Sequence, residues 1–262
     1  MALARDRCIC LRKLDYSETS QILQLFGRDH GLLRVIAKGA HRRTKAGASK
    51  FDGGIDLLDV GDAVFTFDPA RDLNTLTEWG LREGHLALRG SLRAMYLAQY
   101  AAELVALLFE EHDPHPPVFD GLLTLLPGLA TPRAEETFLT FQLDLLRESG
   151  YLPELEGCAE CGFPAGDYDL AYFSPRRGGV VCRNCEGAVT DRLAFDRRLL
   201  RLMQGVLKLP KAEGDVNGGF RERLPRLTRH QTDPLNRLLS EHVEHTLGRR
   251  LRMSKYVLAD GM

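Results

Sequence analysis

The chain has 262 residues, of which 44% are hydrophobic and 27% are charged. These are ordinary values for a globular protein and exclude wholesale disorder. No apolar stretch approaches the roughly 20 residues that cross a bilayer, and the charged N-terminal segment lacks the apolar core of a signal peptide. We therefore expect a soluble, cytosolic protein of about two domains.

The net charge of −1 conceals an uneven distribution of charge along the chain. Residues 1–50 carry a net charge of +7, residues 51–190 carry −14 and residues 191–262 carry +6. Basic surfaces at both ends suit a polyanion such as nucleic acid. The same counts would also arise if opposite charges faced each other in the folded chain.

Short strand-like runs separated by turn residues fill the first eighty or so residues. The expected strands are Arg7–Leu14, Gln21–Phe26, Leu32–Lys38, Asp62–Asp68 and Leu73–Leu81. In the third run, alternation places Arg34 and Lys38 together on one face of the strand. Five short strands fit a small closed barrel of the OB-fold type, and an SH3-like barrel fits the same count.

The apolar residues change to a helical period from Ser91 onward. The expected helices run from Ser91 to the prolines at 114–117, and over Val118–Leu126, Ala134–Glu148, Arg192–Leu209 and Leu235–Leu247. Thr131–Pro132 is predicted to cap the third helix, with Gly150 ending it. Pro210–Pro234, rich in glycine, proline and charge, is predicted to be a long loop.

These patterns predict an α+β protein with two domains. The first is a barrel over residues 1–82, and the second is a mostly helical domain over residues 83–262. The second domain carries a cysteine-bearing insert at about residues 155–190, in which Tyr172–Phe173 and Val180–Val181 are expected to form a hairpin.

Two Cys-x-x-Cys pairs give the strongest local signal in the sequence. Cys158 and Cys161 are followed, after twenty residues, by Cys182 and Cys185. Four soft thiolates at this spacing are typical of a tetrahedral Zn²⁺ site, and a closed site of this kind is structural because it leaves no position for water. A disulfide is not expected in a cytosolic chain, and two separated pairs favour a single ion over an iron–sulfur cluster.

The remaining cysteines and His242 are interpreted as packing residues, and metal binding by His242 with His245 is not expected. Cys8 and Cys10 share one side of the first strand, where free cysteine behaves as a small buried hydrophobe. His242 and His245 lie three residues apart on the last helix, with His242 on its inward side.

The segment Arg34–Lys50 holds seven potential cations and no acidic residue. A basic loop rich in glycine and alanine can follow a phosphate backbone, although a merely solvated loop has the same composition. The segment lacks aromatic residues, so bases would have to stack elsewhere, for example on Tyr16. The residues predicted here to contact DNA are Arg34, Lys38, His41, Arg42, Arg43, Lys45 and Lys50.

A second basic cluster lies on the helix expected after the cysteine pairs. Arg197 and Arg201 share one face of that helix with Lys208. Their spacing suits phosphate contacts, for which Arg197 and Arg201 are predicted, as well as salt bridges to the acidic middle of the chain. The sequence contains no phosphate-binding, dinucleotide-binding or serine-nucleophile motif, so it predicts no catalytic residue.

Several stretches resemble one family when they are taken in order. They are Glu18–Ser20, Phe26–Gly31, Val35–Arg43, Gly150–Pro153 before the cysteine pairs, and Leu247–Leu251 with Ser254. Their order and spacing resemble the bacterial DNA repair family RecO. The resemblance implies an N-terminal OB-fold, a helical domain and an inserted zinc finger that braces the fold.

The resemblance also implies a recombination mediator without enzymatic turnover, located in the cytoplasm with the nucleoid. Such proteins bind single- and double-stranded DNA, anneal complementary strands and join RecR. With RecR they help RecA replace single-strand-binding protein (SSB), whose acidic C-terminal tail they contact. The residues alone leave two other functions open: a protein-interaction scaffold with incidental DNA contact, and a zinc-dependent enzyme acting on nucleic acid, which would need an open metal position.

Overall fold

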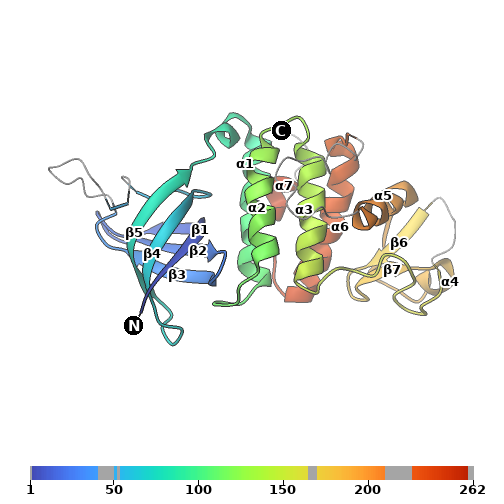
Figure 1. Ribbon diagram of the computed structural model, residues 1–262. Coiled ribbons are helices and arrows are strands. Elements are labelled where there is room, and N and C mark those ends of the chain that lie inside the picture. The colour runs from blue at the N-terminus through green and yellow to red at the C-terminus, as the bar shows by residue number, and fades with distance from the viewer. Residues whose placement is uncertain (1, 41–49, 52–53, 165–169, 210–225, 259–262) are drawn as a thin grey trace. The chain divides into compact units, whose positions relative to one another are not determined.

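The computed structural model describes residues 2–40, 50–51, 54–164, 170–209 and 226–258 (Figure 1). The chain divides into two compact units, Met1–Ala130 and Thr131–Met262. The first two α-helices therefore group with the N-terminal barrel, and the rest of the chain forms the second unit.

Five strands form a closed barrel in the first unit. They are β1 (Ala2–Asp15), β2 (Gln21–Gly27), β3 (Gly31–Ala37), β4 (Val60–Phe67) and β5 (Asn74–Glu83). The strand order is β1-β2-β3-β5-β4, with β1 paired to β4 and a parallel β3–β5 pair. This is the Greek-key order of the OB-fold, so the structure decides between the two barrels that the strand count allowed.

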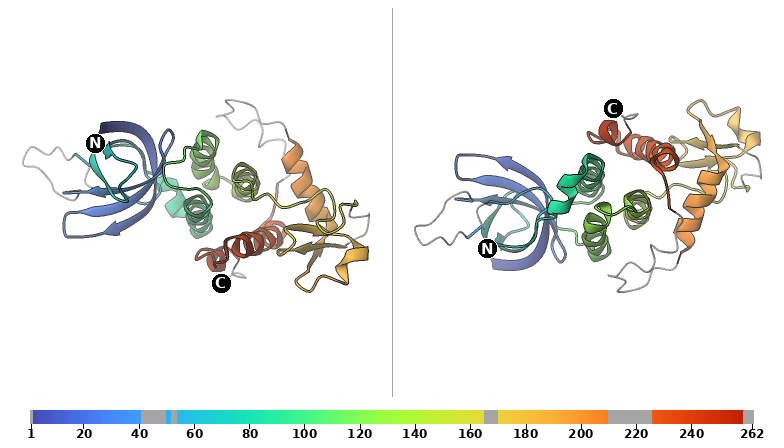
Figure 2. Two further views of the ribbon diagram at one scale, coloured as in Figure 1. Left: turned by 90° about the horizontal axis from the view of Figure 1, so that it is seen from below. Right: turned by 90° about the horizontal axis from the view of Figure 1, so that it is seen from above.

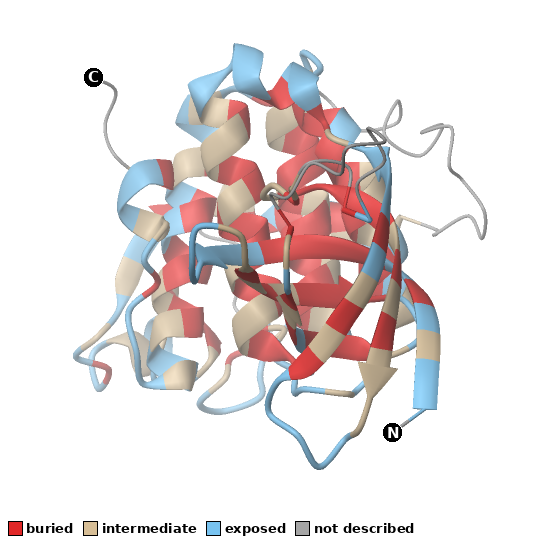
Figure 3. Ribbon diagram, turned by 90° about the vertical axis from the view of Figure 1, so that its left-hand side faces the viewer, coloured by how far each residue is buried: buried red, intermediate tan, exposed pale blue. Residues whose placement is uncertain are grey.

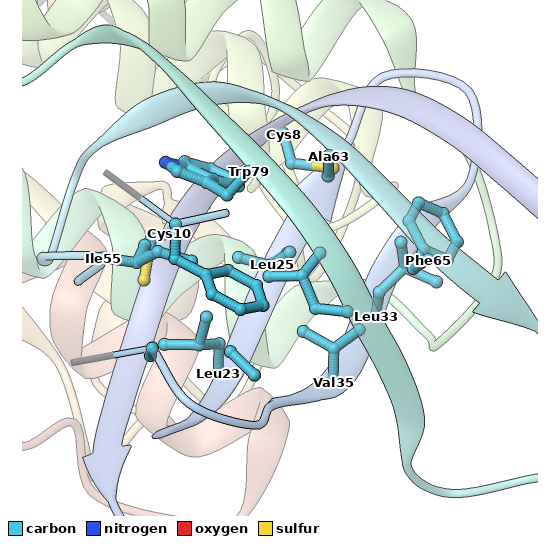
Figure 4. Close-up of a cluster of buried hydrophobic side chains, with 14 residues drawn as sticks. Cys8, Cys10, Leu23, Leu25, Leu33, Val35, Ile55, Ala63, Phe65 and Trp79 are labelled. Atoms are coloured by element: carbon cyan, nitrogen blue, oxygen red, sulfur yellow. The ribbon is translucent and has the colours of Figure 1, made fainter. Parts of the chain in front are cut away.

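Alternating side chains fill the barrel. Leu33 and Val35 of β3 are buried, whereas Arg34 between them is exposed, and β4 alternates in the same way from Asp62 to Thr66. Figure 3 shows buried and more exposed segments along the barrel strands. Cys8 and Cys10 are fully buried in this core (Figure 4). Burial raises the pKa of the Cys10 thiol to about 12, as expected for a neutral packing residue.

The helical part of the first unit consists of a 3₁₀ turn η1 (Leu86–Gly90), α1 (Leu92–Leu108) and α2 (Pro116–Leu129). The Ser91 hydroxyl caps α1 by accepting the N–H of Ala94. Phe26 of β2 packs against Phe119 of α2, with ring centroids 6.1 Å apart.

The second unit combines helices with a small sheet. Its helices are α3 (Ala134–Glu148), α4 (Arg183–Glu186), α5 (Arg197–Lys208), α6 (Arg229–Leu247) and α7 (Ser254–Val257). Strands β6 (Leu170–Ser174), β7 (Gly179–Val181) and β8 (Leu193–Asp196) form a sheet of order β7-β6-β8. Tyr172 faces Val181 across the β6–β7 hairpin, as expected.

Three local predictions are wrong. The N-cap of α3 is Arg133, because the Thr131 hydroxyl accepts the N–H of Arg133 in the turn before the helix. The expected helix Arg192–Leu209 begins with strand β8 instead, since these residues pair with β6. The last helix begins at Arg229 and not at Leu235, so it includes Pro234 and the end of the predicted loop. Residues 210–225 of that predicted loop lie outside the described residues.

None of the helices that the structure describes combines the length and the apolarity needed to cross a bilayer.

Candidate functional site

The four predicted metal ligands come together in the second unit. Cys158 and Cys161 lie in the loop before β6, Cys182 is the N-cap of α4, and Cys185 lies within α4. All four Sγ atoms lie within 4.8 Å of one another, and those of Cys161 and Cys182 are 3.7 Å apart. Thiolates at about 2.3 Å from a tetrahedral ion stand roughly 3.8 Å apart, so this spacing suits one metal ion.

Tight backbone turns hold each cysteine pair. Gly162 lies in the left-handed region at φ +75°, which lets the N–H of Cys158 bond to the carbonyl of Phe163 at 2.8 Å. The N–H of Cys185 donates to the carbonyl of Cys182 at 3.0 Å. The N–H of Cys182 also donates to the Cys158 sulfur at 3.2 Å, which ties the two pairs together.

The protonation of the thiols also fits a metal site. Burial opposes ionisation of Cys158, but backbone N–H groups, first that of Cys182, lower the pKa of its thiol to about 6. Neighbouring thiols, first Cys182, raise the pKa of Cys185 to about 12. Four thiols this close cannot all ionise unless a cation neutralises them, and a metal ion with four sulfur ligands does so.

The cysteine ribbon, residues 154–196, has a small core of its own. Cys158 and Cys182 are buried there with Val181 and Val189, and Tyr172 packs against them. A core of this size cannot stabilise a fold unaided. A metal ion bound by the four cysteine thiols, which we call the thiol cluster, would supply the missing stabilisation of the ribbon.

His242 of α6 connects the ribbon to the helices of the second unit. Its Nε2 lies 2.9 Å from the carbonyl oxygen of Tyr151, and its ring meets Phe173 of β6 edge to face. Burial lowers the pKa of His242. These contacts support the interpretation of His242 as a packing residue.

A row of polar side chains crosses the outer wall of the barrel. Arg12 of β1, Gln24 of β2 and Arg34 of β3 face one another in register, and we call these three residues the arginine row. Both arginines are exposed. Two guanidinium groups in one register row, on the strands to either side of β2, form a surface that can contact successive phosphates.

A second row, parallel to the first, is apolar. Leu14, Ile22 and Ile36 occupy equivalent positions on the same three strands, and we call them the apolar row. Leu14 is 61% exposed, and the two isoleucines are half-buried. Exposed Tyr16 follows at the end of β1. Apolar and aromatic groups beside arginines offer surfaces on which bases can lie.

The basic segment after β3 is anchored to the barrel near its end. The carbonyl of Lys50 accepts the N–H of Trp79 at 2.9 Å. The Gln21 side chain exchanges two hydrogen bonds with the backbone of Ile55, at 3.1 and 3.2 Å. Lys38 and Lys50 are exposed on either side of the segment. The predicted contacts His41, Arg42, Arg43 and Lys45 lie outside the described residues.

Sequence reasoning missed Arg12. Simple alternation along β1 would put Arg12 on the inward side with Cys8 and Cys10. A register shift between Cys10 and Arg12 inserts one residue, so Arg12 faces outward beside Gln24. The only sequence signal was the charge itself, which is costly to place in a barrel core.

The second predicted DNA contact lies on α5. The Asp196 carboxylate caps this helix by accepting the N–H of Arg198 at 2.7 Å. Arg201 is exposed, Arg197 is half-buried, and Lys208 pairs with Glu156 at 3.0 Å. This basic face is thus partly used in a salt bridge to the acidic middle of the chain, the alternative that its spacing allowed.

Comparisons with known proteins match both parts of the chain. The family described as "Recombination protein O N terminal" matches residues 1–85, and "Recombination protein O C terminal" matches residues 89–255. A DNA repair protein RecO from Anaeromyxobacter dehalogenans is 31% identical over 254 residues, which is 95% of this chain and 93% of the relative.

Two further relatives carry the same name. The DNA repair protein RecO of Rubrobacter xylanophilus is 34% identical over 238 residues, covering 87% of this chain and 90% of the relative. That of Rhodopirellula baltica is 37% identical over 179 residues, covering 68% of this chain and 65% of the relative. With a matching N-terminal barrel and a matching helical part, the chain belongs to the RecO family of DNA repair proteins.

Proposed function

We propose that this protein is a DNA repair and recombination mediator that binds single- and double-stranded DNA and anneals complementary strands without catalytic turnover. The observation that carries this proposal is the arginine row on the barrel wall of a chain that matches the RecO family over both parts. The domains proposed are the barrel over residues 1–82 and the helical part over residues 83–262.

In this proposal the barrel wall binds DNA mainly through its backbone. Arg12, Arg34 and Lys38 contact phosphates, and Lys50 extends the contact toward the rest of the basic segment. The other proposed contacts are His41, Arg42, Arg43, Lys45, Arg197 and Arg201. Phosphate contacts carry no sequence information, which suits a protein that must act on any damaged strand.

The apolar row gives single strands an additional contact. The bases of a single strand are free to lie on Leu14, Ile22 and Tyr16, whereas the bases of a duplex are stacked inside the helix. A strand held by its phosphates with its bases accessible can still pair with a complementary strand. This geometry therefore supports annealing as well as binding.

We propose that the thiol cluster holds one structural Zn²⁺ ion through Cys158, Cys161, Cys182 and Cys185. Zn²⁺ prefers four thiolates in a closed tetrahedral set, and its role here is to stabilise the ribbon fold. A four-sulfur site has no open position for a substrate, which argues against the third possibility, a zinc-dependent enzyme.

The proposed partners follow from family membership. They are RecR, the acidic C-terminal tail of SSB and, indirectly, RecA, which the complex helps to load onto SSB-coated single strands in the cytoplasm. The competing proposal is a protein scaffold whose contact with DNA is incidental.

An annealing experiment tests the proposed function. Two complementary oligonucleotides carrying a donor and an acceptor dye are mixed with the protein, and duplex formation is followed by energy transfer. We expect the protein to accelerate annealing, and the variant Arg12→Ala/Arg34→Ala to lose most of this acceleration. A protein that retains RecR in excess single-stranded DNA but leaves the annealing rate unchanged would be a scaffold instead.

A further inference from the structure

A hollow in the second unit holds four arginines that the proposed function does not use. It has a volume of about 810 Å³ and lies between the ribbon and the end of α6. Arg176 and Arg192 line it from the ribbon, and Arg249 and Arg250 line it from the turn after α6. Figures 1 and 2 show α6 beside β6 and β7, and the Phe173–His242 contact joins these elements.

The turn that carries Arg249 and Arg250 is held firmly. Gly248 ends α6 in the left-handed region at φ +64°, where glycine is unstrained. The Glu244 carboxylate accepts the N–H of Leu251 at 2.9 Å and the hydroxyl of Ser254 at 3.1 Å. This accounts for the stretch Leu247–Ser254 that the sequence singled out: its glycine, leucine and serine fix the turn, and its two arginines are exposed in the hollow.

Two of the three carboxylates in the lining are engaged in local structure. Glu244 holds the turn, as described above. Asp191 accepts the Ser174 hydroxyl and the N–H of Arg176, each at 2.9 Å. Burial opposes ionisation of Asp191, but these hydrogen bonds hold the pKa of its carboxyl below the usual value. The carboxylates of Glu244 and Asp191 therefore already accept hydrogen bonds from backbone N–H groups and serine hydroxyls.

Glu241 is the third carboxylate in the lining. Burial, with the nearby Glu244, raises the pKa of Glu241, although Arg237 acts in the opposite direction. No ion pair joins Arg249 or Arg250 to a carboxylate among the residues that the structure describes. Arg192 is only partly used, since one of its nitrogens donates to the carbonyls of Glu186 and Val189.

A surplus of guanidinium groups in a concave, polar site is suited to anions. Guanidinium forks bind phosphate or carboxylate oxygens in pairs, and a concave site concentrates their field. The lining contains only two larger apolar residues, Pro175 and Leu193. A docking site for a peptide needs apolar anchors, whereas nucleic-acid contacts are more polar and more positively charged. The composition of the hollow therefore favours phosphates.

We infer that this hollow binds the phosphate backbone of a nucleic-acid strand, as a second contact separate from the barrel wall. This inference rests on the proposed function, because it assumes that the protein binds nucleic acid. Two separate phosphate sites in one chain would let the protein hold two strands, or two parts of one strand, at the same time.

The test uses the full chain and a labelled oligothymidylate of about 20 nucleotides, titrated by fluorescence anisotropy over a range of salt concentrations. Arg249→Ala/Arg250→Ala should weaken binding about tenfold and reduce the salt slope by about 1.4, which corresponds to two lost phosphate contacts on a single strand. The matched control Arg226→Ala/Lys255→Ala removes two exposed charges from the same unit outside the lining and should change little.

A variant that gains affinity distinguishes an effect on the hollow from a loss of folded protein. Glu241→Gln removes the carboxylate that is not tied into local structure and keeps the side-chain shape, so it should strengthen oligothymidylate binding about threefold. Metal content and circular dichroism of each variant should match those of the unchanged protein. A misfolded protein cannot reproduce this gain.

The outcomes separate the two proposals. If the unchanged protein does not bind the oligonucleotide even at low salt, the proposed function fails. If it binds, and the Arg249/Arg250 variant behaves like the control, only the present inference is overturned. The inference is also overturned if a peptide of aspartate and glutamate binds and is lost in that variant while oligonucleotide binding is unchanged.

Discussion

Arg12 of β1 and Arg34 of β3 face opposite sides of Gln24 in one register row of the barrel wall. Both side chains are exposed, and Arg34 is the first residue of the basic segment Arg34–Lys50. This relationship depends on the shift in register between Cys10 and Arg12, which turns Arg12 outward.

Replacing both residues of this pair tests whether the wall binds phosphates. Arg12→Ala/Arg34→Ala should weaken binding to all DNA sequences alike and reduce the salt slope by about 1.4 on single strands. The control Arg71→Ala/Arg82→Ala removes two barrel arginines that already pair with Asp68 and Asp62. Equal salt slopes for the two double variants would show that the arginine row does not contact phosphates.

The apolar row makes a different prediction. Leu14→Ser should weaken single-stranded DNA binding about fivefold, because a base loses its apolar contact, and should leave duplex binding nearly unchanged. Parallel anisotropy titrations with a single strand and its duplex measure the ratio. Leu3→Ser, at another exposed leucine of β1, is the control. An equal loss on both forms of DNA would show that Leu14 does not contact bases.

Metal removal should unfold the ribbon and spare the barrel. A chelator, or Cys161→Ser, should abolish protection from hydrogen exchange in the β6–β7 hairpin, since the small ribbon core cannot hold it without the ion. Strands β2 and β3 should keep their protection. Elemental analysis should find one zinc per chain, and a four-cysteine ribbon that stays protected in chelator would contradict the structural role.

Asp6 should be a major stabilising residue of the first unit. Its side chain is 1% exposed and accepts the N–H groups of Asp29 and His30 and the Nδ1 of His30, each at about 3.0 Å. Asp6→Ala leaves these donors without a partner, so we expect a loss of about 2–4 kcal/mol in unfolding free energy. Urea denaturation measures it, with exposed Asp29→Ala as the control. A change below about 1 kcal/mol would be inconsistent with this role.

His242 predicts how stability depends on pH. Burial lowers its pKa below 6.5, so the unfolded chain binds a proton more readily than the folded one. The contribution of His242 is therefore fully present above pH 6.5 and is lost as pH falls below it. His242→Gln should flatten the fall in unfolding free energy between about pH 7 and 5. An unchanged pH profile of unfolding free energy in His242→Gln would contradict this role of His242.

The barrel strands could be predicted from the sequence alone, because apolar and polar residues alternate in runs such as Leu32–Lys38 and turn residues separate the runs. The expected strand Gln21–Phe26 and the observed β2 differ by one residue. Strand β8 could not be predicted, since Leu193–Asp196 is extended only through pairing with β6, and its sequence continues into a helix. Local propensity does not contain such a tertiary contact.

The candidate sites likewise differ in whether they depend on local sequence or on tertiary packing. Cys-x-x-Cys spacing is a local property, so the four cysteines were predicted directly from the sequence, and the structure brings their sulfur atoms together. Arg12 depends on a one-residue shift in register, and the hollow depends on how α6 packs against the ribbon. Neither feature repeats along the chain, so no pattern in the sequence could reveal it.

Binding of a labelled single-stranded oligonucleotide at about 50 and 200 mM salt tests the central claim most directly. We expect tight binding at low salt that weakens by a factor of about ten or more at the higher concentration, because each arginine–phosphate contact releases cations condensed on the DNA and added salt opposes that release. No binding at either concentration, with the folded protein and its metal intact, would contradict a protein that holds DNA through its own barrel wall.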